Sequence, residues 1–143
     1  MNYFVVAFLC WTGVLSAQSV EGLWVSWDDE TGLAKSEVSI VVEDGTLSGS
    51  IVRLLLPEDQ GKKCIHCKGA DKNAPIAGLT IIKGLRIEDG IWQGGTILDP
   101  KSGKEYRCKI EWVDEHTLNV RGYLGFSVFG RTQVWKRKQP QKE

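Results

Sequence analysis

The chain has 143 residues with 18 basic and 18 acidic side chains, so its formal net charge is zero. This length suits one domain, and the neutral balance argues against a general nucleic-acid binder, which needs a basic excess to displace counterions. The ordinary hydrophobic share of 42% argues against a wholly disordered chain.

The amino terminus has the pattern of a signal peptide. Residues 1–19 contain no Lys, Arg, Asp or Glu, residues 3–15 are almost all apolar, and small residues follow. Such a run is too short to span a bilayer and is typical of an export signal. We therefore expect cleavage after Ala17 or Ser19, one domain over residues 20–138, a polar tail over 139–143, and a periplasmic protein, with secretion as the second choice.

The rest of the chain predicts short β-strands separated by turns. Residues 22–27 form the first expected strand, and the acidic, glycine-closed segment 28–32 forms a turn. Strands over 36–42 and 46–54 flank an Asp-Gly dipeptide, which is the signal of a tight hairpin. The Lys-, Gly- and Cys-rich segment 58–77 is expected to be a long loop, and loops of this length are functional or disordered.

The second half predicts further strands over residues 91–98, 104–113, 117–123 and 132–137, while residues 79–87, interrupted by Gly84, are ambiguous. The strand over 104–113 alternates strictly, with Tyr106, Cys108, Ile110 and Trp112 on one face and charged residues on the other. About eight strands with no amphipathic helix imply an all-β, antiparallel fold. We expect an up-and-down barrel because closure removes exposed strand edges.

The start of the first strand resembles that of the lipocalins and related calycin barrels. Gly22-Leu23-Trp24 matches their Gly-x-Trp motif. In those proteins an Arg near the chain end packs across the Trp. The resemblance therefore implies that Arg131, or as second choice Arg121, packs on Trp24 in a lipocalin-like β-barrel.

A wider pattern resembles the bacterial family known as domain of unknown function 2147. The matching motifs, in chain order, are Trp24 followed by Asp28-Asp29-Glu30-Thr31-Gly32, Gly45-x-Leu47-x-Gly49-x-Ile51, Cys64-x-x-Cys67-x-Gly69, Pro75-Ile76-x-Gly78, Trp92-x-Gly94-Gly95, Gly103-Lys104-x-Tyr106, Arg121-Gly122-Tyr123 and Phe129-Gly130-Arg131. The resemblance covers nearly all of residues 22–137 and implies an exported bacterial protein with a lipocalin-like barrel. It implies no reaction.

Export changes the meaning of the cysteines, since an oxidising compartment favours disulfides. Cys64 and Cys67 are spaced like a redox motif beside lysines that would lower a thiol pKa, and with His66 and Cys108 they could also bind zinc. Loop entropy alone favours a bridge from the loop to Cys108. Because Cys108 alternates with core residues, we instead expect a Cys64–Cys67 disulfide and a free, buried Cys108.

No enzyme, metal site or cofactor is predicted from the remaining chemistry. Asp28-Asp29-Glu30 could supply a general acid and base or bind calcium, but the regular spacing of calcium ligands is missing and a turn is expected. With only His66 and His116, no Ser-His-Asp arrangement can be assigned.

The many aromatic side chains suggest a ligand pocket inside the barrel. The expected lining residues are Trp92, Tyr106, Trp112, Tyr123, Phe126 and Phe129, with Arg121 for an acidic head group. The leading function is therefore non-enzymatic binding of a small apolar or amphiphilic molecule. The alternatives are a structural or interaction protein of the cell envelope with a filled barrel, and a thiol-redox or metal site at Cys64 and Cys67. The sequence leaves the oligomeric state open.

Charge is uneven along the chain. Residues 20–60 carry nine acidic and two basic side chains, whereas residues 61–143 carry nine acidic and sixteen basic ones. The two signs can cancel across neighbouring strands, or the basic part can meet an anionic partner.

Overall fold

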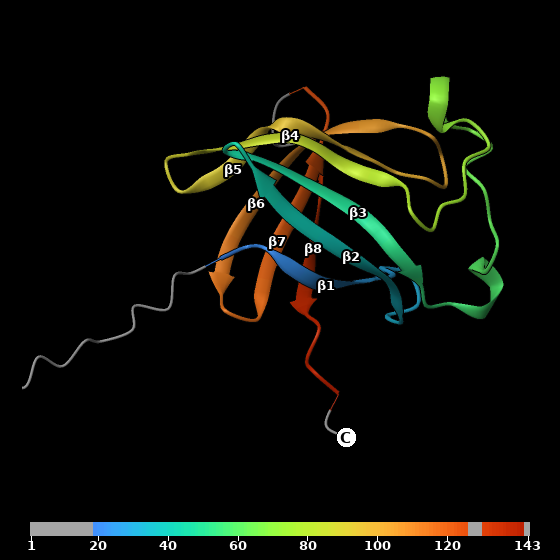
Figure 1. The fold of residues 1–143 in the computed structure, drawn as a ribbon, viewed down its shortest axis with the longest axis horizontal. Helices are drawn as coiled ribbons and strands as arrows, with labels where there is room; N and C mark the ends of the chain where they lie inside the picture. The colour runs from blue at the N-terminus through green and yellow to red at the C-terminus, as the bar shows by residue number, and fades with distance from the viewer. Residues whose placement is uncertain (1–18, 126–129, 142–143) are drawn as a thin grey trace, which may run out of the picture.

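The structure, a computed structural model, describes residues 19–125 and 130–141. In this part of the chain eight antiparallel strands close into a barrel, each paired with the next and β8 with β1 (Figure 1). The predicted fold class is confirmed. The strands are β1 (Gly22–Trp27), β2 (Ala34–Glu43), β3 (Thr46–Leu54), β4 (Thr80–Glu88), β5 (Ile91–Leu98), β6 (Glu105–Asp114), β7 (Thr117–Tyr123) and β8 (Gly130–Arg137).

The tight hairpin turns follow the Asp-Gly dipeptides. Asp44 and Asp89 have φ of 51° and 50°, and the glycines after them, Gly45 and Gly90, have φ of 74° and 78°. Two consecutive residues with positive φ make the turn whose twist matches that of antiparallel strands. Two strands begin earlier than expected, β2 at Ala34 and β8 at Gly130, because their first residues pair with the ends of β1 and β7.

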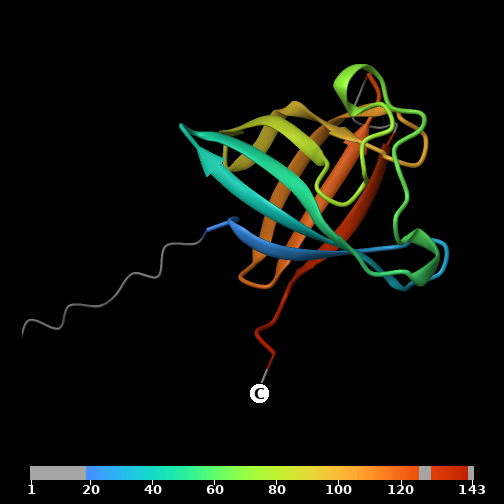
Figure 2. The same cartoon turned by 45° about the vertical axis from the view of Figure 1, so that its right-hand side comes forward.

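Because successive strands run in opposite directions, their connections lie at two ends of the barrel. At one end, here called the turn end, lie the hairpin turns around residues 44–45, 89–90 and 115–116. At the other, here called the loop end, lie segments 28–33, 55–79 and 99–104. Figure 2 shows the hairpin turns to the left and the long green excursion between β3 and β4 to the right.

The excursion over residues 55–79, here called the stapled loop, is compact. It contains two short 3₁₀ helices, η1 (Pro57–Asp59) and η2 (Gly69–Asp71). The amide of Cys64 donates to the carbonyl of Ala74 at 2.8 Å, and the amide of Asn73 donates to the carbonyl of Cys64 at 2.9 Å. The loop thus carries its own hydrogen-bonded framework rather than lying open to solvent.

Inward side chains of the strands form one apolar core. Trp24 and Trp135 are the largest fully buried residues, and buried aliphatic side chains come from β2 to β7. The fully buried aliphatic residues are Val38, Ile40, Leu47, Ile82, Leu85, Ile110 and Leu118. Among the described residues, no helix has the length and apolar character needed to cross a membrane.

Candidate functional site

Arg137 covers Trp24 at the turn end of the barrel. The guanidinium carbon lies 4.2 Å from the centre of the Trp24 ring and 5.9 Å from that of Trp112. The guanidinium also donates hydrogen bonds of 2.7 Å to the backbone carbonyls of Ser19, Glu21 and Glu115. Trp24 itself donates from Nε1 to the carbonyl of Val20 at 2.8 Å. The stack and these hydrogen bonds fix one end of the barrel.

The prediction that Arg131 or Arg121 packs on Trp24 is wrong. Antiparallel pairing places Trp24 opposite Arg137, at the end of β8, whereas Arg131 lies near the start of that strand at the loop end. The side chain of Arg131 is 74% exposed and its Nη1 lies 3.3 Å from Oδ2 of Asp29.

The predicted pocket residues do not converge on one space. Trp92 and Trp112 pack against the core in the half of the barrel near the turn end, while half-buried Tyr106 lies near the loop end. Phe126 and Phe129 lie outside the described residues. The described residues of the predicted aromatic pocket therefore do not lie around one common space.

Arg121 and Tyr123 lie on the face of β7 opposite the one that carries Leu118 and Val120, and Tyr123 is buried there at 8% exposed. They pair with Lys109 and Arg107, which alternate with the buried Cys108 and Ile110. Arg121 donates to Oγ1 of Thr132 at 3.0 Å. It borders a polar hollow of about 190 Å³ on this face, below the roughly 300 Å³ of ordinary ligand sites. The expectation that Arg121 receives a head group inside the barrel is wrong.

The cysteine pairing is as predicted. Cys64 and Cys67 form a disulfide with a Cα–Cα distance of 5.3 Å, and Cys108 is free. Both bonded cysteines are buried in the core cluster, so the sulfurs are shielded from a redox partner. Burial also raises the pKa of the Cys108 thiol to about 12. The described residues contain no group of three or more His, Cys, Asp or Glu that could hold a metal ion.

The two aspartates of the acidic turn after β1 both accept structural hydrogen bonds. Asp28 accepts hydrogen bonds from the amide and hydroxyl of Thr31 and the amide of Glu30, and these bonds, the Thr31 amide foremost, lower the pKa of its carboxyl. Asp29 accepts from Gln133 at 3.1 Å, and Gln133 in turn accepts from Nε1 of Trp135 at 3.0 Å. The turn expected here is present, and it is tied through Gln133 to the core.

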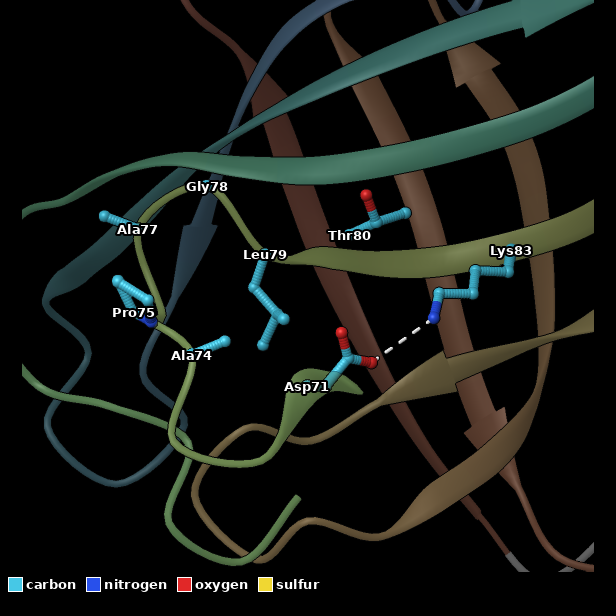
Figure 3. Close-up of a pocket in the computed structure, with 8 residues that line it drawn as sticks. All are labelled: Asp71, Ala74, Pro75, Ala77, Gly78, Leu79, Thr80 and Lys83. Atoms are coloured by element: carbon cyan, nitrogen blue, oxygen red, sulfur yellow. Dashed lines mark hydrogen bonds and ion pairs between the residues drawn. The ribbon is translucent and has the colours of Figure 1, made fainter. Parts of the chain in front are cut away.

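A larger hollow lies at the loop end, where the stapled loop returns to β4. Its volume is about 470 Å³. Figure 3 shows its lining residues. The side chain of Leu79 points toward Asp71 of η2, and the side chain of Lys83 also points toward Asp71. The lining residues are Asp71, Ala74, Pro75, Ala77, Gly78, Leu79, Thr80 and Lys83.

One ion pair closes the side of this loop-end hollow. Nζ of Lys83 lies 3.4 Å from Oδ2 of Asp71, and the two side chains are 48% and 35% exposed. A pair this exposed contributes at most about 1 kcal/mol, so a ligand can replace it. Neither residue was predicted as a site residue, because the contact joins a loop to a strand and depends on how the loop folds back.

Comparison with known proteins agrees with this architecture. The family model described as "Uncharacterized protein conserved in bacteria (DUF2147)" matches residues 22–137. Among solved structures, protein HP1028 from the human pathogen Helicobacter pylori, which belongs to the lipocalin family, aligns over 85% of this chain and 84% of that chain with a TM-score of 0.73. The two sequences are 16% identical, so the similarity shows the fold alone. A comparison with curated proteins finds no significant match. The chain belongs to the bacterial family DUF2147, and its fold is a lipocalin-like, eight-stranded barrel.

Proposed function

We propose that the protein is an exported, periplasmic, non-enzymatic binding protein that holds a small amphiphile in the loop-end hollow. The observation that carries this proposal is the hollow itself, about 470 Å³ in volume. Ligand sites in proteins typically measure about 300–1,000 Å³, with mostly apolar walls and a few polar groups that orient the ligand.

The lining chemistry suits a molecule with an apolar tail and an acidic head. Leu79, Pro75 and Ala74 offer apolar surface, and Lys83 offers the cation. A ligand carboxylate that takes the place of Asp71 gains a charge-assisted hydrogen bond from Nζ of Lys83. The tail gains about 25 cal/mol for each Å² of apolar surface that leaves water.

Three placements support binding rather than catalysis. The two histidines, His66 and His116, lie at opposite ends of the barrel. The Cys64–Cys67 disulfide is buried, and Cys108 is held as a neutral thiol.

Export is supported by the apolar amino terminus, which lies outside the described residues, and by a disulfide of the kind that persists in oxidising compartments.

The alternative is a structural or interaction protein whose barrel is filled. The complete burial of Trp24 and Trp135 favours it, since side chains of this size fill a small barrel without a ligand. In our proposal the filled core and the binding site are separate, because the hollow lies beside the stapled loop.

Calorimetric titration with decanoate distinguishes the two functions. Ala74 points across the hollow in Figure 3, so Ala74→Phe should fill it and abolish the binding heat. Ala70→Phe adds the same group to an exposed position of the same loop that does not line the hollow, and should bind as the parent does. Lys83→Gln should weaken binding roughly three- to tenfold, as expected for a half-exposed charge. Arg86→Gln, on the same strand but outside the hollow, should not.

Two results would contradict the proposal. One is decanoate binding that is unaffected by Ala74→Phe in a variant whose thermal unfolding shows an intact fold. The other is the absence of any binding heat with the parent protein, which would favour the filled structural barrel.

A further inference from the structure

Two segments at the loop end carry five exposed lysines and an exposed isoleucine. These segments, the stapled loop and the turn between β5 and β6, touch each other. Sγ of Cys64 lies 3.3 Å from the carbonyl oxygen of Pro100. Gly103 lies so close to the carbonyl of His66 that a Cβ at this position would clash with it. We call the six residues the lysine surface: Lys63, Ile65, Lys68, Lys72, Lys101 and Lys104.

The positive charge of this surface is not neutralised locally. Within residues 19–125 and 130–141, none of the five lysine amines has an ion-pair or hydrogen-bond partner. Two of the neighbouring carboxylates are paired with lysines outside this surface. Asp59 lies 2.7 Å from Nζ of Lys62, and Asp71 pairs with Lys83. Asp99, which accepts from the hydroxyl of Ser102 at 2.7 Å, and the exposed Glu105 are the acidic side chains that remain beside Lys101 and Lys104.

Ile65 is held outward by covalent geometry. The residues on either side of the Ile65–His66 dipeptide are Cys64 and Cys67, both buried and bonded to each other. The dipeptide therefore forms the tip of a closed four-residue ring, and Ile65 is 61% exposed. The disulfide thus keeps this aliphatic side chain exposed on the segment that carries Lys63 and Lys68.

The hairpin turns at the turn end carry carboxylates. Each of its three hairpin turns presents two adjacent carboxylates: Glu43 and Asp44, Glu88 and Asp89, and Asp114 and Glu115. An anionic surface therefore attracts the five lysines, whereas it repels the carboxylates of these three turns.

We propose that the lysine surface docks the protein on an anionic phospholipid bilayer, with the lysines at the lipid phosphates and Ile65 in the headgroup region. A basic segment with an apolar side chain among its cations suits a membrane interface, where both terms favour binding. A nucleic acid would engage the charge but not the isoleucine. None of the six residues lines the loop-end hollow, so this proposal does not depend on ligand binding there.

Vesicle co-sedimentation tests the surface with the full chain. The vesicles contain equal parts phosphatidylglycerol and phosphatidylethanolamine, and phosphatidylcholine vesicles serve as the neutral comparison. Lys63→Gln with Lys68→Gln should lower partitioning about fivefold for each charge removed. Arg86→Gln with Arg107→Gln removes the same charge from the barrel wall and should change it little. Ile65→Ser should weaken binding, whereas Ile87→Ser, at a residue that is 59% exposed on a strand leading to the turn end, should not.

Every variant keeps the same amino terminus, so any contribution of residues 1–19 is common to the series. Partitioning that is lost with added salt and with the loop-end variants alone supports the proposal. Equal binding to phosphatidylcholine, equal losses in the wall variants, or no binding to the anionic vesicles overturns it. Binding to heparin or DNA without binding to vesicles also overturns it, in favour of a polyanionic partner.

Discussion

The thiol of Cys108 couples the stability of this barrel to pH. The side chain is fully buried on β6, where its cross-strand neighbours are Gly95 and Gly122. Burial disfavours the thiolate, and the pKa rises from 9.0 to about 12. The folded protein therefore keeps the thiol proton at pH values where the unfolded chain releases it.

The free energy of unfolding should consequently fall as pH rises above the thiol pKa of the unfolded chain, near 9.0, and continue to fall toward the folded-state value. The slope contributed by this one group is at most about 1.4 kcal/mol per pH unit. Urea unfolding at neutral and alkaline pH should show a smaller alkaline loss in Cys108→Ala than in the parent. Other titrating groups are common to both proteins, so an identical loss in the variant would show that Cys108 does not provide the coupling.

The junction between β1 and β8 has the fewest paired residues of any strand pair in the barrel. Only Trp24 and Val25 pair in register with β8, whereas all six residues of β1 pair with β2. Lys138 reinforces the junction, since its amide donates to the carbonyl of Leu23 and its Nζ lies 2.8 Å from Oε1 of the buried Glu37. Arg137 adds the stack on Trp24 and its bonds to three carbonyls.

Arg137→Ala should therefore destabilise the barrel much more than Arg131→Ala. The loss of a half-buried cation–π contact and of three charged hydrogen bonds should cost about 2–3 kcal/mol, which lowers Tm by roughly 10 °C. Arg131 makes one exposed ion pair, so its removal should cost less than about 1 kcal/mol. Thermal unfolding followed by circular dichroism measures both; similar losses in the two variants would contradict this account of the junction.

Local patterns predicted the strands and tight turns better than the contacts across the junction between β1 and β8. Period-two alternation located β6, and the Asp-Gly dipeptides located two hairpins, since both signals depend on neighbouring residues. The partner of Trp24 depends instead on which end of β8 meets β1. The direction of the strands could have predicted this partner. An antiparallel β8 must end where β1 begins, and Arg137 is the last residue of β8.

The molecule as a whole separates a filled core from the hollow proposed as the binding site. The number of aromatic residues predicted a pocket, but it could not say which of them point inward. Arg121 and the buried Tyr123 proved to lie on the face of β7 that points away from the barrel core. The loop-end hollow arises from tertiary contacts of the stapled loop, such as the hydrogen bond from Gly78 to Ile51, which no local pattern encodes. Lipocalin-like topology therefore establishes the scaffold, and the folded loop creates the candidate site.

A crystal structure of the protein with decanoate tests the central claim, that the ligand site lies in the loop-end hollow and not along the barrel axis. We expect the acyl chain against Leu79 and Pro75, with the carboxylate at Nζ of Lys83 and Asp71 displaced from its ion pair. Decanoate bound inside the barrel between Tyr106 and Trp135, with the Asp71–Lys83 pair intact, would contradict the account.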